Sequence, residues 1–189
     1  MKIENLFPTG ILKHKVSSEL SDHIESILTP RLDNLNAVGN VLSDYYENSI
    51  VTLGELGLLV REIFNCQKHY SEVTQYNEAT EISSYWIQDY KGGHDHARHN
   101  HGRNQYSAVY WVRANEKSGQ FIIHSPNPFS TIWSENIESE GHRENLYSQD
   151  HTYITPEKGL IVLFPSYLDH EVLVGREGCV RTTIAFNLK

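Results

Sequence analysis

The chain has 189 residues, a formal net charge of −8, and 39% hydrophobic and 21% charged residues. This length suits one globular domain with a sizeable core. The acidic balance, without a Lys/Arg cluster, argues against nucleic acid or anionic lipid as a partner. No apolar run approaches the ~20 residues that cross a bilayer, and the start lacks the features of a signal peptide. We therefore expect a cytoplasmic protein whose two cysteines, Cys66 and Cys179, are reduced thiols.

Residues 1–80 are expected to be mainly helical. One helix should begin with Ser17 or Ser18 as its N-cap and stop at Pro30. A second should lie within residues 53–76, where Gly54 and Gly57 weaken its beginning. Its apolar stripe at helical spacing comprises Leu56, Leu59, Val60, Ile63, Phe64 and Val73. These stripes indicate a helical layer packed on a sheet.

From residue 82 the pattern changes to short segments rich in β-branched and aromatic residues, separated by Gly, Pro, Asn and Asp. The expected strands lie within residues 82–90, 105–113, 119–125, 151–156, 159–166, 170–174 and 180–188. Helices followed by strands predict a single α+β domain over 1–189. In this prediction residues 82–189 form an antiparallel sandwich or barrel, and the mainly helical residues 1–80 pack against it as a supporting layer.

The polar segment 125–150 is expected to form a loop near the mouth of this barrel. Four residues could line the mouth, although a core or solvated-loop position is the simpler interpretation of each: Trp111, His124, Trp133 and Arg143.

Four of the eleven histidines lie between residues 94 and 101. His99 and His101 immediately precede a strand, and alternation could present both imidazoles to one cavity. His94 and His96 follow two glycines, so we expect them in a turn, outside the metal shell, either on the surface or lining the entrance. A third candidate ligand, His170, opens a later strand.

Arg181 lies in the otherwise apolar segment VRTTIAFNL. A buried guanidinium is costly unless it is paired with an anion, and no acidic residue is obviously placed on a neighbouring strand. A bound dicarboxylate would satisfy it, because guanidinium grips a carboxylate in bidentate fashion.

Three ordered motifs carry a family resemblance: H-x-H before YSAVYWV, then GLIVLFPSYLDHEV, then RTTIAFN. They resemble the 2-oxoglutarate/Fe(II)-dependent oxygenases over residues 86–187, and the opening IENLFPTGI is similar to the start of such proteins. The resemblance implies a double-stranded β-helix, a jelly-roll and cupin-like barrel. It also implies an Fe(II)-, 2-oxoglutarate- and O2-dependent dioxygenase that hydroxylates an unidentified small molecule or peptide and converts 2-oxoglutarate to succinate.

The resemblance also implies a set of metal ligands. His99 and His170 match the family's two histidine ligands, and His101 stands at the carboxylate position. The usual ligand set of such oxygenases is two histidines and one carboxylate. This chain would instead use three neutral imidazoles, unless Asp95 reaches in from the preceding turn.

For the cosubstrate, Arg181 matches the arginine that holds the distal carboxylate of 2-oxoglutarate. Thr183 matches the neighbouring hydroxyl position, and Tyr90 matches a tyrosine that some relatives use on the same carboxylate.

Two alternatives stay open. A cupin-type metalloenzyme fits G-x5-H-x-H from Gly93, together with Pro165 and His170, but the cupin glutamate position holds Gln105. A non-enzymatic barrel could bind a small acid or a partner protein. The oligomeric state is open, with a homodimer as one option.

Overall fold

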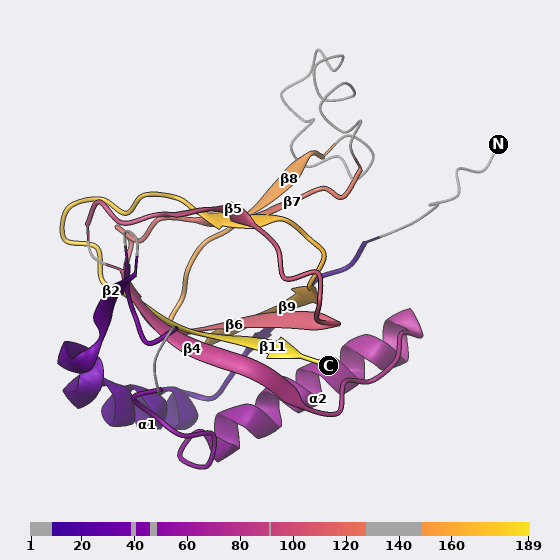
Figure 1. Ribbon diagram of the computed structural model, residues 1–189, viewed down its shortest axis with the longest axis horizontal. Coiled ribbons are helices and arrows are strands. Elements are labelled where there is room, and N and C mark those ends of the chain that lie inside the picture. Colours follow the sequence, from indigo (N-terminus) through magenta and orange to yellow (C-terminus); the bar gives the residue numbers. More distant parts are fainter. Residues whose placement is uncertain (1–8, 39–40, 46–48, 91, 128–148) are drawn as a thin grey trace.

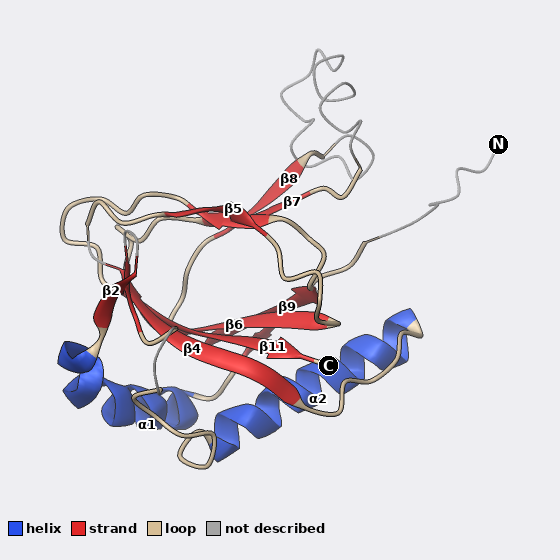
Figure 2. Cartoon of the chain, in the orientation of Figure 1, coloured by secondary structure: helices blue, strands red, loops and turns tan. Residues whose placement is uncertain are grey.

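The computed structural model describes residues 9–38, 41–45, 49–90, 92–127 and 149–189. Two antiparallel sheets face each other, and two helices cover the outer face of the larger sheet (Figures 1 and 2). The domain therefore has three layers: helices, large sheet and small sheet.

The first helix, α1 (Ser18–Leu28), begins where the sequence predicts. The Ser17 hydroxyl accepts a hydrogen bond from the backbone N–H of Leu20, as an N-cap does. The α-helix ends before Pro30, which lies in the first turn of a short 3-10 helix, η1 (Thr29–Asn34).

The second helix, α2 (Gly57–Thr74), starts at the second of the two glycines and is capped at its C-terminus by Gln75, whose φ of 60° is left-handed. Leu59 and Ile63 are buried against the sheet. Val73 is 70% exposed, so its assignment to the apolar stripe was wrong. It is the penultimate residue of the helix, beyond the packed stripe.

The larger sheet has seven strands in the order β1-β9-β6-β11-β4-β3-β2. Their bounds are β1 Leu12–Lys15, β2 Asn36–Val38, β3 Val41–Ser43, β4 Ile82–Tyr90, β6 Tyr106–Ala114, β9 Leu160–Pro165 and β11 Arg181–Leu188. The smaller sheet has the order β5-β10-β7-β8, with β5 His96–His99, β7 Phe121–His124, β8 His151–Ile154 and β10 His170–Val172. Strands β4, β6, β9 and β11 face the smaller sheet, and together with its four strands they form the double-stranded β-helix.

Alternation along the strands divides the core in two. On β9, Ile161 and Leu163 pack with the helices, whereas Val162 and Phe164 face the smaller sheet. On β6, Trp111 likewise joins the core between the two sheets. This inner core fills part of the space between the two sheets, and a cavity lies beside it.

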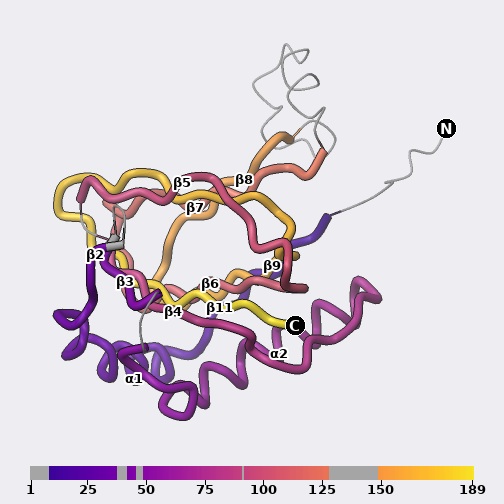
Figure 3. The backbone as a smooth tube through the Cα atoms, viewed as in Figure 1, coloured from indigo at the N-terminus to yellow at the C-terminus, as the bar shows by residue number. Residues whose placement is uncertain are grey.

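All seven predicted strands are present. The sequence missed β5 and the three short strands from the N-terminal region, of which the β2–β3 pair lies beside β4 (Figure 3). The N-terminal region thus extends the sheet as well as supporting it. No helix within the described ranges has an apolar stretch long enough to span a bilayer.

Candidate active site

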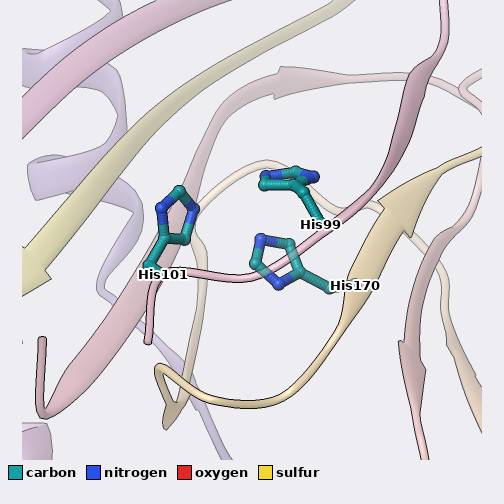
Figure 4. Close-up of side chains that lie close together, drawn as sticks. All are labelled: His99, His101 and His170. Atoms are coloured by element: carbon teal, nitrogen blue, oxygen red, sulfur yellow. The ribbon is translucent and has the colours of Figure 1, made fainter. Parts of the chain in front are cut away.

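Three imidazoles meet between the two sheets. Ligand nitrogens of His99, His101 and His170 all lie within 4.8 Å of one another. His99 ends β5 and is the direct register partner of His170 at the start of β10, so strand pairing brings together residues 71 positions apart (170 − 99). His101 lies in the loop after β5, where its backbone N–H donates to Ser166 O at 2.9 Å. Figure 4 shows the three rings around a common space.

Backbone carbonyls orient two of these rings. Nδ1 of His99 lies 2.8 Å from Ala97 O, and Nδ1 of His170 lies 3.0 Å from Leu168 O. A carbonyl can only accept, so each Nδ1 carries a proton, and in the neutral ring the lone pair is then on Nε2. Metal-binding histidines are commonly oriented in this way.

Burial, together with the neighbouring His99, lowers the pKa of His170 to about 3 and that of His101 to about 4. These two imidazoles are therefore neutral at physiological pH. Neutral imidazoles are the form that binds metal ions. The cluster is therefore ready to bind at physiological pH.

Asp169, outside the cluster, connects the segment around His99 to the segment that begins with His170. Its carboxylate accepts hydrogen bonds from Arg98 Nε at 2.9 Å and Asn100 Nδ2 at 2.7 Å. These residues flank His99, and Asp169 precedes His170. The donors lower the pKa of the Asp169 carboxyl, with Asn100 contributing most.

The other residues of the histidine-rich stretch lie outside the cluster. His96 belongs to β5 rather than to a turn, because the chain pairs with β10 from this residue onward. Its ring stacks on that of His99 at 4.2 Å between centroids and lines the same cavity. His94 precedes β5. Asp95 is not among the clustered residues, so the three-ligand group contains no carboxylate.

Arg181 lies at one end of the cavity, 2% exposed. Its Nη1 donates to Gly119 O at 2.9 Å, and its guanidinium carbon lies 4.1 Å from the centre of the Tyr90 ring. Its Nε is buried without a hydrogen-bond partner, and no carboxylate forms an ion pair with it in the described part of the chain. Burial raises the pKa of Tyr90 to about 12, so its hydroxyl stays protonated.

Alternation on β4 and β11 builds the cavity wall. Tyr90 is the register partner of Arg181, and Thr183 is the partner of Gln88. All four side chains line the cavity, as do residues that the motifs did not indicate: Trp86, Ser107, Phe121, Val172, Ala185 and Asn187. The signal for several of these was available, because they continue the two-residue period from Tyr90 and Arg181. Among the described residues, no Asp or Glu lines the cavity.

Two of the four candidate mouth residues, Trp111 and His124, do not line this cavity. Trp111 is fully buried in the core between the sheets, which confirms the simpler interpretation. His124 pairs with Glu171 at 3.0 Å. Trp133 and Arg143 lie outside the described residues. Cys66 and Cys179 are free, buried thiols.

This fold and this cluster define a double-stranded β-helix protein with a three-histidine metal-binding geometry. A family model described as "Putative 2OG-Fe(II) oxygenase" matches residues 84–187. Because the match takes in more than half of the 189 residues, the chain belongs to this family of 2-oxoglutarate- and Fe(II)-dependent oxygenases. The cofactors expected from the sequence, Fe(II), 2-oxoglutarate and O2, are those of the family, and the cupin alternative is set aside.

Solved structures with the same fold support the architecture. An oxidoreductase of the 2OG-Fe(II) oxygenase family from Burkholderia pseudomallei is 13% identical, with a TM-score of 0.65 over 95% of this chain and 84% of that one. A Pseudomonas putida prolyl-4-hydroxylase is 15% identical, with a TM-score of 0.64 over 96% and 92%. HygX from Streptomyces hygroscopicus, solved with nickel and 2-oxoglutarate, is 10% identical, with a TM-score of 0.61 over 95% and 82%. A search of curated protein sequences finds no significant match.

The described residues fit the family's cofactors. Three imidazoles whose ligand nitrogens lie within 4.8 Å of one another form a donor set that suits Fe(II). The buried Nε of Arg181 is an unpaired donor that a carboxylate would satisfy.

Proposed function

We propose that His99, His101 and His170 hold Fe(II), and that Arg181 holds the distal carboxylate of 2-oxoglutarate, so that the protein hydroxylates a C–H bond of its substrate. Bound together, Fe(II) and 2-oxoglutarate activate O2, and the balanced outcome is an alcohol, succinate and CO2 from substrate, 2-oxoglutarate and O2. The observation that carries the proposal is a three-imidazole cluster in one cavity with a buried arginine that has no carboxylate partner among the described residues.

Each group has a role that follows from its charge. Imidazole binds a metal ion in its neutral form, so three such ligands would leave the charge of the divalent ion uncompensated and favour a dianionic cosubstrate. Arg181 supplies the second positive charge at the far end, where burial strengthens its pairing with a carboxylate. The Thr183 hydroxyl lines the same end and can donate to that carboxylate. The protonated Tyr90 hydroxyl donates to Gln88 Oε1 at 3.1 Å and would have to turn from it to donate to the carboxylate.

His101 takes the place of a carboxylate ligand in this proposal. A His101→Asp variant should still bind divalent metal, because it restores the more usual set of two histidines and one carboxylate. It should bind 2-oxoglutarate less tightly, because the added negative charge lowers the net charge of the site.

A succinate-release assay tests the activity. Purified protein with Fe(II), ascorbate and 2-oxoglutarate is screened over amino acids, peptides and nucleotides, with Arg181→Ala and His170→Ala as controls. Substrate-stimulated succinate that both variants lose would support the proposal. Succinate release unchanged in both variants would contradict the assigned roles.

A further inference from the structure

The charge in the lining of the cavity lies at one end. Among the described residues that line it, Arg181 is the only one with a permanent charge. Along β4, Trp86 lies four residues from Tyr90, the register partner of Arg181, which corresponds to about 13 Å along a strand. At this second end the polar groups are neutral and already satisfied, since Ser107 donates to the Asn187 side chain at 2.9 Å. An ion bound here would meet no counter-charge from the lining.

Trp86 is the aromatic wall beside the metal cluster at this second end. It is 4% exposed and lines the cavity, and its ring centre lies 5.5 Å from that of His101. A group that contacts Trp86 inside the cavity would therefore lie next to one of the proposed metal ligands.

Tyr45 continues this wall to the surface. Its ring packs edge-on against Trp86, with 4.9 Å between centroids and an interplanar angle of 86°, yet the residue is 48% exposed. Large aromatic side chains are usually covered, and an exposed one held against a cavity wall is a common recognition element.

The backbone holds Tyr45 in place. The preceding residue, Asp44, is buried, and its carboxylate accepts the Ile87 N–H of β4 at 2.7 Å. Its other oxygen accepts from the Ser49 hydroxyl at 2.7 Å and the Ile50 N–H at 3.0 Å. These bonds extend the edge of β3 past its last residue and fix Tyr45 beside β4, so the pair is formed before any ligand arrives.

We infer that Trp86 and Tyr45 form the substrate-binding wall, and that it takes an uncharged, carbon-rich group that carries the C–H bond to be oxidised. This inference rests on the proposed function. A carboxylate on that group would be drawn to Arg181 and would compete with 2-oxoglutarate, and an ammonium group would be repelled by the metal and Arg181. Ring faces and C–H bonds pack on aromatic walls without either cost.

Three matched fragments test the charge preference: cyclohexylmethanol, cyclohexanecarboxylate and cyclohexylmethylammonium. Each is added to the full chain loaded with Mn(II) and 2-oxoglutarate, and paramagnetic broadening of its proton resonances reports proximity to the metal without turnover. The alcohol should be broadened most. Tyr45→Ala should weaken its binding about three- to tenfold, the range of a lost aromatic contact.

Trp86→Leu should also weaken alcohol binding while keeping an apolar side chain in the wall. Tyr153→Ala is the matched control, because Tyr153 is exposed on β8 and its ring contacts His151 instead. Equal broadening of all three fragments, preference for the ammonium fragment, or alcohol binding unchanged in both wall variants would overturn the inference.

Titrations of Mn(II) and 2-oxoglutarate on the same proteins distinguish failure of the substrate wall from failure of the proposed function. If both bind as proposed and no fragment approaches the metal, the substrate wall is wrong and the proposed function stands. If Mn(II) binding does not depend on His99 and His170, the proposed function fails and the wall fails with it.

Discussion

Replacing Arg181 with alanine should weaken 2-oxoglutarate binding and leave metal binding in place. The guanidinium is 2% exposed, makes one hydrogen bond to Gly119 O, and has a buried Nε without a partner. A carboxylate bound there would form a desolvated charge pair, and removing one member of such a pair costs about 2–5 kcal/mol. That corresponds to a dissociation constant raised roughly 30-fold to several thousand-fold.

Two further variants separate charge from geometry. Arg181→Lys keeps the charge but loses the planar fork, so its affinity should lie between those of wild type and the alanine variant. Arg113→Ala is the matched control on the neighbouring strand β6. Arg113 faces away from the cavity, where Asp89 and Thr182 bind it, so its loss should leave 2-oxoglutarate affinity unchanged.

Isothermal titration calorimetry of 2-oxoglutarate into the Ni(II)-loaded proteins measures these affinities. Alanine at 181 also removes the contact with the Tyr90 ring, worth about 0.5–2 kcal/mol, so a melting curve must show that each variant is folded at the titration temperature. Wild-type affinity in a folded Arg181→Ala protein would refute the reasoning.

Three other changes have defined outcomes. Gly119→Ala places a Cβ 1.7 Å from Leu173 O, so urea denaturation should show that the free energy of unfolding falls by about 1–3 kcal/mol or more. Gly57→Ala is the control, because the space around Gly57 is open and the change should cost no stability. Equal stability of the two variants would contradict the packing around Gly119. Asp169→Ala frees the loop after β5 from the residue before His170, and Ni(II) affinity should fall about tenfold; unchanged affinity would show that the tie is dispensable. In metal-free protein the folded-state pKa of His170 is lowered to about 3. As the pH drops from about 6.5, this histidine is therefore protonated in the unfolded chain before it is protonated in the folded protein. The free energy of unfolding should then fall by up to about 1.4 kcal/mol per pH unit for this group. His170→Gln should flatten that slope, and an unchanged slope would show that the histidine is not its source.

Most of the barrel was predictable because its strands carry a clear local signal. The predicted strands within residues 82–90 and 180–188 correspond to β4 and β11, where β-branched and aromatic residues run between turn residues. The strand β5 was missed because its sequence, HARH, lacks β-branched residues, and its pairing with β10 is set by a segment about 70 residues away. The short strands β1 to β3 were missed for a similar reason: three or four residues carry too little periodicity to be distinguished from a loop.

The candidate site was predictable to the extent that motifs and unusual burial mark it. A lone arginine in an apolar strand pointed to Arg181, and H-x-H with a distant histidine pointed to the cluster. The sequence could not show that His96 stacks on His99, that Gly119 binds Arg181, or that Tyr45 packs on Trp86. These contacts join segments that the sequence holds apart, and only the paired strands bring them together.

Metal binding by the histidine cluster is the central claim, and equilibrium binding of Fe(II) under anaerobic conditions tests it most directly. Wild-type protein should bind one Fe(II) per chain tightly, and 2-oxoglutarate should bind tightly only when that metal is present. A His99→Ala, His170→Ala double variant should remain folded but lose tight binding of both, whereas His94→Ala should behave as wild type. Full iron occupancy in the double variant would contradict the account.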